Sequence, residues 1–325
     1  MEDSNFTPRT DLTELTSLIE RVRAEIKKII VGQETTINMM IAAVLADGHV
    51  LIEGVPGIAK TLLAKLIAKT ISAGFSRIQF TPDLMPSDIL GTSVFNMKIS
   101  EFEFNRGPIF SNIILIDEIN RAPAKTQSAL FEAMEERQVT VDGTTYKMES
   151  LFTVFATQNP IEHEGTYKLP EAQLDRFLFK IEMDYPSAEE EIKILVDLHS
   201  RKNINDLSLV QLVFTKDSLN TLREKVRSAH LDEKVARYIT QIVNKTRNNS
   251  DIYLGGSPRA SISIMIGAKS IAAINGRDFV TPDDVRQVVY PALRHRILLT
   301  PEKEMEGRTP DDIIKSILER VEVPR

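Results

Sequence analysis

Apolar residues in the first half of the chain follow two patterns, a helical spacing and short uninterrupted runs. Between residues 12 and 30 they recur every three or four positions, which predicts a helix with one buried stripe, and a second helix is expected over 34–46. Compact apolar runs predict strands over 49–53, 77–80, 113–116, 152–156 and 177–181. Because helical or turn-rich sequence separates these runs, the pattern predicts an α/β fold with a parallel sheet.

Two stretches interrupt this alternation with the period-two pattern of strands. Residues 91–107 alternate apolar and polar side chains, and residues 138–148 do the same around Asp142 and Gly143. An Asp-Gly pair favours the tight turn of a β-hairpin. We therefore expect two β-hairpins inserted into the α/β core.

Strand signals fade after Tyr185, and the remaining sequence is typical of helices. These are expected over residues 188–199, 216–229, 232–248, 258–275 and 282–294. Ser187 precedes three consecutive glutamates, a pattern that favours a helix start. The sequence thus predicts two domains, an α/β core over residues 1–186 and an all-helical lid over 187–325.

Composition narrows the classes of protein that remain. The 325 residues are 42% hydrophobic and 26% charged, as in globular proteins, and their net charge of -6 provides no general field for nucleic acid. With no cysteine, the chain has no disulfide, thiol nucleophile or cysteine-ligated metal. The apolar stretch 39–52 is too short for a membrane span, and residues 1–11 do not resemble a secretion signal, so we expect a cytoplasmic location.

A glycine-containing turn joins the strand predicted over 49–53 to the next helix. The candidate nucleotide-binding residues here are Gly54, Val55, Pro56, Gly57, Ile58, Ala59, Lys60, Thr61 and Leu62. In a phosphate-binding loop, backbone N–H groups cradle the phosphates of ATP, Lys60 neutralises the β- and γ-phosphates, and the Thr61 hydroxyl ligates Mg²⁺. A strand-to-helix turn with a fortuitous Lys-Thr is the alternative that this segment alone leaves open.

Ala59 stands where the phosphate-binding motif has its second glycine. Because side chains other than glycine disfavour positive φ, we expect this backbone to keep a negative φ. We also expect the loop to leave room for the methyl group.

The strand predicted over 113–116 ends in two carboxylates, Asp117 and Glu118. In a metal-assisted ATPase, Asp117 would hold Mg²⁺ and Glu118 would polarise a water for in-line attack on the γ-phosphate. The alternative is a strand that simply leaves the sheet through two acidic residues. The presence of a candidate phosphate-binding loop in the same chain favours the ATPase.

Asn159 follows the strand predicted over 152–156. Because the carboxyl ends of parallel strands share one edge of a sheet, this side chain can contact the γ-phosphate or the attacking water. Asn-Pro is also a common turn, so a purely structural role stays open.

Arg176 and Arg259 are the cations best suited to stabilise transition-state charge, because a guanidinium matches phosphate geometry. Pro258 suits the first turn of a helix, which would place Arg259 near a helix N-terminus facing the core. Either arginine would serve equally well in a surface ion pair, and spacing alone does not decide between these roles.

The motifs taken together resemble the MoxR family of AAA+ ATPases. They are Val31-Gly32-Gln33, GVPGIAKT at 54–61, TPDLMPSDILG at 81–91, GPIF at 107–110, LIDEINRAP at 115–123, ATQNP at 156–160, EAQLDRF at 171–177 and GSPRA at 256–260. The resemblance spans residues 12–300, and the family's loop often carries the same alanine.

The resemblance implies roles that spacing does not show. Asn159 is similar to the sensor-1 residue, Arg176 to the arginine finger that completes a neighbour's site, and Arg259 to sensor 2 on the lid. Gly32 and Gln33 are similar to the segment that lies against the adenine. The hairpins at 91–107 and 138–149 resemble the helix-2 insert and the pre-sensor-1 hairpin, which face a central pore or a partner in related rings.

The resemblance implies that ATP and Mg²⁺ bind between core and lid and that hydrolysis drives chaperone-like remodelling, assembly or activation of a client protein complex. A von Willebrand factor A domain protein is a common partner in the family, and metal insertion is a task of some members. Because an arginine finger needs a neighbouring subunit, the implied active form is a nucleotide-dependent ring, usually hexameric.

Two other functions compete with this interpretation. Related ATPases with such inserts include nucleic-acid motors. In this chain, however, Lys147 is the only basic residue between 138 and 148. In the hairpin at 91–107, two glutamates balance the charges of Lys98 and Arg106. A strand-tracking loop needs cations for the phosphates, so a helicase-like motor is disfavoured. A nucleotide-binding scaffold without turnover is the third possibility, which the full set of candidate catalytic residues disfavours.

Overall fold

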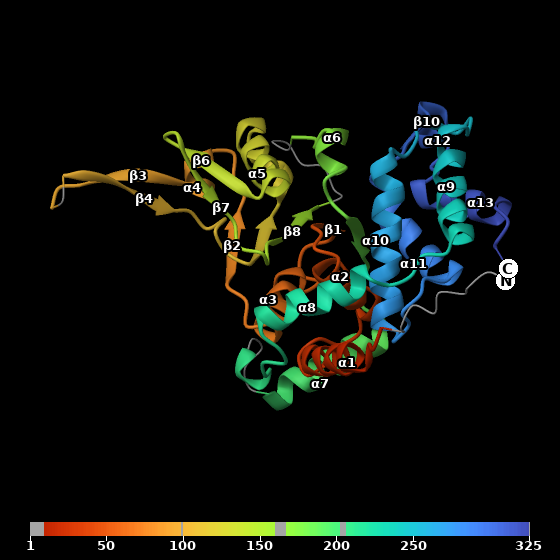
Figure 1. The fold of residues 1–325 in the computed structure, drawn as a ribbon, viewed down its shortest axis with the longest axis horizontal. Coiled ribbons are helices and arrows are strands. Elements are labelled where there is room, and N and C mark those ends of the chain that lie inside the picture. The colour runs from red at the N-terminus through yellow and green to blue at the C-terminus, as the bar shows by residue number, and fades with distance from the viewer. Residues whose placement is uncertain (1–9, 99, 160–166, 202–205, 325) are drawn as a thin grey trace, which may run out of the picture.

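A parallel sheet of five strands forms the centre of the computed structural model, which describes residues 10–98, 100–159, 167–201 and 206–324 (Figure 1). The strand order is β2-β5-β8-β1-β9. The strands are β1 (Val50–Gly54), β2 (Phe75–Gln79), β5 (Ile113–Asp117), β8 (Thr153–Gln158) and β9 (Phe179–Met183). All four neighbouring pairs are parallel, so the predicted α/β sheet is confirmed.

Helices cover both faces of this sheet because its inner strands are apolar on both sides. Alternate residues of β1, β5 and β8 enter two separate hydrophobic clusters. One cluster contains α1 (Thr13–Lys27), α2 (Glu34–Leu45) and α3 (Lys60–Thr70), and the other contains α5 (Ala124–Glu136). The strands therefore appear in the sequence as continuous apolar runs, as expected of a doubly covered parallel sheet.

Both predicted β-hairpins are present. β3 (Gly91–Asn96) and β4 (Glu101–Arg106) follow the short helix α4 (Pro86–Leu90) and project from the body, at the left of Figure 1. β6 (Gln138–Val141) and β7 (Thr144–Lys147) flank a turn in which Asp142 and Gly143 have φ of 50° and 79°. The rings of Phe104 and Tyr146 stack with centroids 4.2 Å apart and join the two hairpins.

Helices make up most of the C-terminal region. They are α7 (Ala188–Arg201), α8 (Lys216–Arg227), α9 (Glu233–Arg247), α10 (Pro258–Ile274), α11 (Pro282–Leu293), α12 (Pro301–Met305) and α13 (Pro310–Arg320), after the short α6 (Glu171–Leu174). A two-stranded ribbon of β10 (Ile252–Leu254) and β11 (Leu298–Leu299) was not predicted, because strands of two or three residues produce no periodicity. Short 3-10 turns cover Ile119–Arg121 and Leu207–Leu209.

The C-terminal helices pack directly on the sheet region. Residues of α8 to α11 belong to the same hydrophobic cluster as α1 to α3. Arg223 of α8 is buried, donates to the Val44 carbonyl at 2.9 Å and pairs with Asp47 at 2.8 Å. Among the described residues, no helix is both long and apolar enough to span a membrane.

A buried histidine at the start of β1 makes stability depend on pH. Val154 N–H donates to His49 Nδ1, and Nε2 lies 3.4 Å from the Met134 carbonyl, so the neutral ring uses both nitrogens. Burial lowers the pKa of His49 from 6.5 to about 3. The unfolded chain therefore takes up a proton below pH 6.5 that the folded chain excludes, and folded stability falls as pH decreases from 6.5 toward 3.

We expect His49 to reduce the free energy of unfolding by up to about 1.4 kcal/mol per pH unit in this window. Urea unfolding at pH 7, 6 and 5 measures the slope. The matched variant is His49→Gln, whose amide retains a donor and an acceptor but does not titrate. Burial also lowers the pKa of His295, so the stability of the wild type and of His49→Gln should both still depend on pH. The dependence should be weaker in His49→Gln. An equal dependence in the two proteins would contradict the role of His49.

Candidate active site

The strand register places the predicted phosphate-binding loop and the predicted acidic pair at one edge of the sheet. Ile52 of β1 pairs with Thr157 of β8, and Ile116 of β5 pairs with Ala156. The loop after Gly54, the pair beginning at Asp117, and Asn159 after β8 therefore all follow the carboxyl ends of neighbouring strands. This is the edge at which open α/β sheets bind ligands.

The loop between β1 and α3 has an open cradle. Gly57 has φ 90°, and a Cβ added there would meet no heavy atom within 4 Å. A Cβ at Gly54 would instead lie 2.8 Å from the Met183 carbonyl oxygen, so glycine is required there. Lys60, Thr61 and Leu62 form the first turn of α3, whose N–H groups have no partner within the helix.

Ala59 adopts the left-handed conformation, with φ 65° and ψ 21°. The predicted negative φ is therefore wrong. The loop requires the left-handed backbone that a second glycine would provide, and the alanine accepts a strain of order 1 kcal/mol to supply it. The geometry of the loop, rather than the preference of its residue, decides this position.

Lys60 lies among carboxylates at the same edge. Its Nζ donates to the Gly54 carbonyl at 2.6 Å across the loop. Burial lowers the pKa of Lys60, while the charges of Asp117, Glu118 and Glu53 act in the opposite direction. The lysine and the acidic pair are thus close enough to interact electrostatically, which is the arrangement needed to hold a nucleotide phosphate and its metal.

Asp117 is buried and held by two side chains that sequence analysis did not single out. Thr157 Oγ1 donates to Asp117 Oδ1 at 3.3 Å, and Arg77 Nε donates to Oδ2 at 2.6 Å. Thr157 and Arg77 lie on β8 and β2, the two strands beside β5. The sequence carries no signal for these contacts because the strand order is not the order along the chain.

Glu118 is positioned by its backbone and by three neighbours. Its φ is 56°, and its N–H donates to Thr157 Oγ1 at 3.0 Å. Gln79 Nε2 donates to Glu118 Oε2 at 2.8 Å, and Arg121 lies 3.1 Å from the same oxygen. Gln79, at the end of β2, therefore helps to hold the Glu118 carboxylate, and it is a further residue that the sequence analysis missed.

The residues at this edge fit a magnesium ion that arrives with a nucleotide. Mg²⁺ commonly takes one or two carboxylates and fills its other positions with phosphate oxygens and water. Asp117 supplies one buried carboxylate, and Thr61 supplies a hydroxyl from the first turn of α3. In the part of the chain that the structure describes, no cluster of three or more His, Asp or Glu offers a competing all-protein metal site.

Gly32 and Gln33 lie beside the start of α7. Both have positive φ, 69° and 56°, and Gln33 Nε2 donates to the Asp184 carbonyl at 3.1 Å. A Cβ at Gly32 would lie 2.0 Å from Glu190 Oε1. Because Asp184 follows the carboxyl end of β9, this segment lies at the same edge as the phosphate-binding loop.

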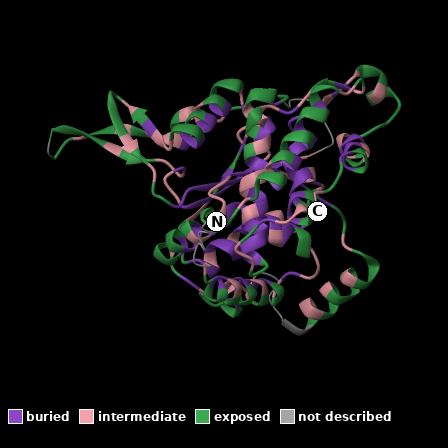
Figure 2. Cartoon of the chain, turned by 45° about the vertical axis from the view of Figure 1, so that its right-hand side comes forward, coloured by how far each residue is buried: buried purple, intermediate pink, exposed green. Residues whose placement is uncertain are grey.

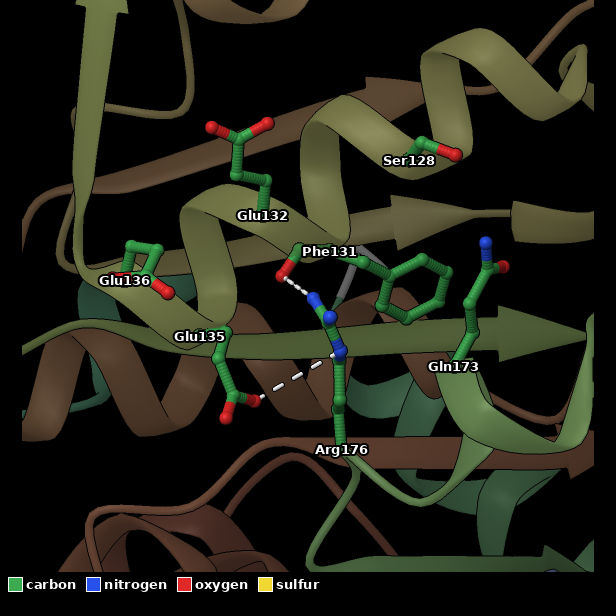
Figure 3. A pocket seen from close by; sticks show the side chains of 7 residues that line it. All are labelled: Ser128, Phe131, Glu132, Glu135, Glu136, Gln173 and Arg176. Atoms are coloured by element: carbon green, nitrogen blue, oxygen red, sulfur yellow. Dashed lines mark hydrogen bonds and ion pairs between the residues drawn. The ribbon is translucent and has the colours of Figure 1, made fainter.

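Arg176 and Arg259 converge on one carboxylate of α5. Arg259 Nη2 lies 2.8 Å from Glu135 Oε1, and Arg176 Nε lies 3.8 Å from Oε2. Arg176 also donates to the Phe131 carbonyl, in a pocket of about 300 Å³ shown in Figure 3. Arg259 occupies the first turn of α10 after Pro258 and faces the core, as predicted.

These arginines lie at the amino edge of the sheet, opposite the phosphate-binding loop. Arg176 precedes β9, whose first residue Phe179 pairs with Val50, whereas the loop follows Gly54, which pairs with Met183. Val50 and Gly54 are four residue steps apart, so the two ends of β1 are separated by about 13 Å, more than the length of an arginine side chain. Within one chain, Arg176 therefore cannot reach the phosphates that this loop would bind.

The same edge holds Arg259, because Glu135 directly follows Met134, whose carbonyl contacts His49 at the start of β1. The structure thus brings Lys60, Asp117 and Glu118 together at one edge and gathers the two arginines at the other. A site that uses all of them needs two copies of the chain.

Comparison with known proteins agrees with this architecture. Residues 49–179 match the model of the ATPase family associated with various cellular activities (AAA), and residues 244–317 match the AAA lid domain. The chain is 45% identical over 316 residues to Chaperone MoxR1 of Mycobacterium tuberculosis (strain ATCC 25618 / H37Rv), covering 94% of this chain and 82% of that protein. The chain belongs to the MoxR family of AAA+ ATPases.

Other relatives of this MoxR-family chain cover nearly its whole length. It is 46% identical to YeaC of Bacillus subtilis (strain 168), over 96% of both chains, and 29% identical to Protein MoxR of Paracoccus denitrificans, over 86% and 88%. A crystal structure from Cytophaga hutchinsonii ATCC 33406, of a protein assigned as an ATPase, superposes with a TM-score of 0.89 at 42% identity, over 97% of both chains. The predicted family and fold class are confirmed, and the family implies nucleotide binding and oligomerisation.

Proposed function

We propose that this MoxR-family protein hydrolyses ATP in a Mg²⁺-dependent reaction and uses the cycle to remodel, assemble or activate a client protein complex. The observation that carries the proposal is the division of the candidate catalytic residues between opposite edges of the sheet. Such a division suits a ring in which each site is completed by the next subunit. We propose a hexamer, with a core up to residue 186 and a lid from residue 187.

Each group at the carboxyl edge has a separate task in the proposed reaction. Lys60 and the N–H groups at the start of α3 bind the phosphates. Asp117 and Thr61 would hold Mg²⁺, which neutralises phosphate charge when it is bound. Glu118 accepts a hydrogen bond and then a proton from the attacking water, and Asn159, as sensor 1, orients that water or the γ-phosphate.

The neighbouring subunit completes the proposed site. Its Arg176 and Arg259 place two guanidinium groups against the γ-phosphate and stabilise the charge that spreads over its oxygens. Glu135 holds the two cations together in the free chain despite their like charge. Both the arginine finger and sensor 2 therefore act across the subunit interface.

Exposed apolar residues on the β3–β4 hairpin support a protein client. Phe95, Met97 and Phe102 are exposed, and the rings of Phe95 and Phe102 lie 5.2 Å apart across the hairpin. Asn96 donates to Glu103 on the same hairpin, whose charges do not favour phosphate binding. We propose that the client complex contains a von Willebrand factor A domain protein, with metal insertion as one task.

Nucleotide binding is tested by Lys60→Ala. Removal of the ammonium from the phosphate cradle should weaken ATP affinity about tenfold or more, which corresponds to about 1.4 kcal/mol. Titration calorimetry with ATP and Mg²⁺ measures the affinity, and Lys65→Ala, which changes a lysine elsewhere on α3, is the matched control. Unchanged affinity in Lys60→Ala would show that the loop is not the phosphate site.

A further inference from the structure

Helix α7 carries an apolar stripe with no partner among the described residues. Ile192, Leu195 and Val196 occupy one face at helical spacing and are 62%, 68% and 62% exposed. None of residues 188–199 is buried, and Figure 2 shows this helix in pink and green without purple. An exposed apolar stripe of this kind marks an interaction surface. We call these three residues the α7 stripe.

The α7 stripe lies on the nucleotide side of the molecule. Ser187 N–H donates to Glu190 Oε2 at 2.8 Å and caps the helix directly after β9. Glu190 also lies against Gly32, next to the segment predicted to contact the adenine. A partner that covers the α7 stripe therefore sits beside the nucleotide site, at the carboxyl edge of the sheet.

Three further exposed apolar residues lie in the lid, one of them next to Arg259 on α10. Tyr253, Ile262 and Met305 are 78%, 51% and 81% exposed, and Ile262 lies one helical turn after Arg259 on α10. Thr300 N–H donates to the Asp251 carbonyl and places α12 beside β10. We call Tyr253, Ile262 and Met305 the lid patch.

Resting on the ring proposed above, we infer that the α7 stripe of one subunit docks on the lid patch of the next copy of this chain. The contact is heterologous, because the two surfaces differ and lie beside opposite halves of the divided site. It brings Arg176 and Arg259 of the second copy toward the nucleotide of the first. Docking of the α7 stripes of two copies on each other would instead bring two nucleotide sites together and leave the arginines away from both.

The test places a charge on each surface in a chain that also carries Glu118→Gln, which slows turnover. Light scattering with ATP and Mg²⁺ gives the mass of the parent, of Leu195→Glu and of Ile262→Glu. We expect the parent to form rings and both variants to stay monomeric, with ATP affinity within twofold of the parent by calorimetry. Lys193→Glu, on another face of α7, is the control and should still form rings.

Mixing the two variants distinguishes a heterologous contact from general damage. Leu195→Glu keeps an intact lid patch and Ile262→Glu keeps an intact α7 stripe, so an equimolar mixture should form dimers and nothing larger. A misfolded variant would form neither dimers nor a parent-like complex with ATP.

Two different failures can be told apart. Rings formed by Leu195→Glu as readily as by the parent would overturn the inferred contact and leave the ring standing. A parent that binds ATP but stays monomeric would overturn the proposed ring and the contact with it.

Discussion

A Glu118→Gln variant should bind ATP with unchanged affinity and release phosphate on the order of 10²-fold more slowly. Thr157 accepts a hydrogen bond from the Glu118 backbone N–H, and Gln79 donates to the Glu118 carboxylate, which lies close enough to Lys60 to influence the pKa of that lysine. An amide keeps the size and the hydrogen bonds of the side chain but cannot accept a proton from water. The loss should therefore appear in kcat and leave ATP binding intact.

Phosphate release at saturating ATP measures kcat, and calorimetry measures the affinity. Glu233→Gln, a change on the exposed surface of α9, is the matched control and should leave kcat unchanged. Wild-type turnover in Glu118→Gln would remove this residue from the reaction. An equal loss in the control would point to damage of the fold instead.

The sequence was sufficient to predict those site residues that stand at the carboxyl ends of strands. Gly54 and Asp117 end their strands and Asn159 directly follows its strand, and parallel strands place their carboxyl ends at one edge. The prediction needed only the local pattern and this rule. It did not need the positions of the strands within the sheet.

Contacts between neighbouring strands depend on that order and were not predicted. Arg77 and Gln79 of β2 reach Asp117 and Glu118 because β2 lies beside β5, although about forty residues separate them in the sequence. In the sequence, Thr157 is indistinguishable from any other β-branched residue of a strand. Its contact with the acidic pair becomes visible once β5 and β8 are paired.

Periodicity also does not reveal which chain covers an apolar stripe. The spacing over 188–199 correctly predicts a helix, yet its apolar residues stay exposed, whereas the similar stripe of α1 is buried in the core. Helical spacing shows that a face is apolar and leaves the identity of its partner open. A partner for the α7 stripe can be inferred only from the structure, which places this helix beside Gly32 and Gln33.

An Arg176→Ala variant should lose on the order of 10³-fold in kcat, the scale at which a phosphate-directed arginine acts. Arg176 lies at the amino end of β1, about 13 Å from the end at which its own phosphate-binding loop begins, so the loss must come from the site of the neighbouring subunit. ATP affinity should change little, because Lys60 and the start of α3 remain. Arg237→Ala, which removes an exposed arginine of α9, is the matched control.

Mixing distinguishes action across the interface from action within one chain. Arg176→Ala has an intact phosphate-binding loop, and Lys60→Ala has an intact arginine, so each lacks one half of the site. In a mixed ring, an Arg176→Ala subunit whose neighbour carries Lys60→Ala regains a complete site. Phosphate release should therefore rise well above the sum of the two variants alone, and activity that stays at that sum would show that Arg176 serves its own chain or no site at all.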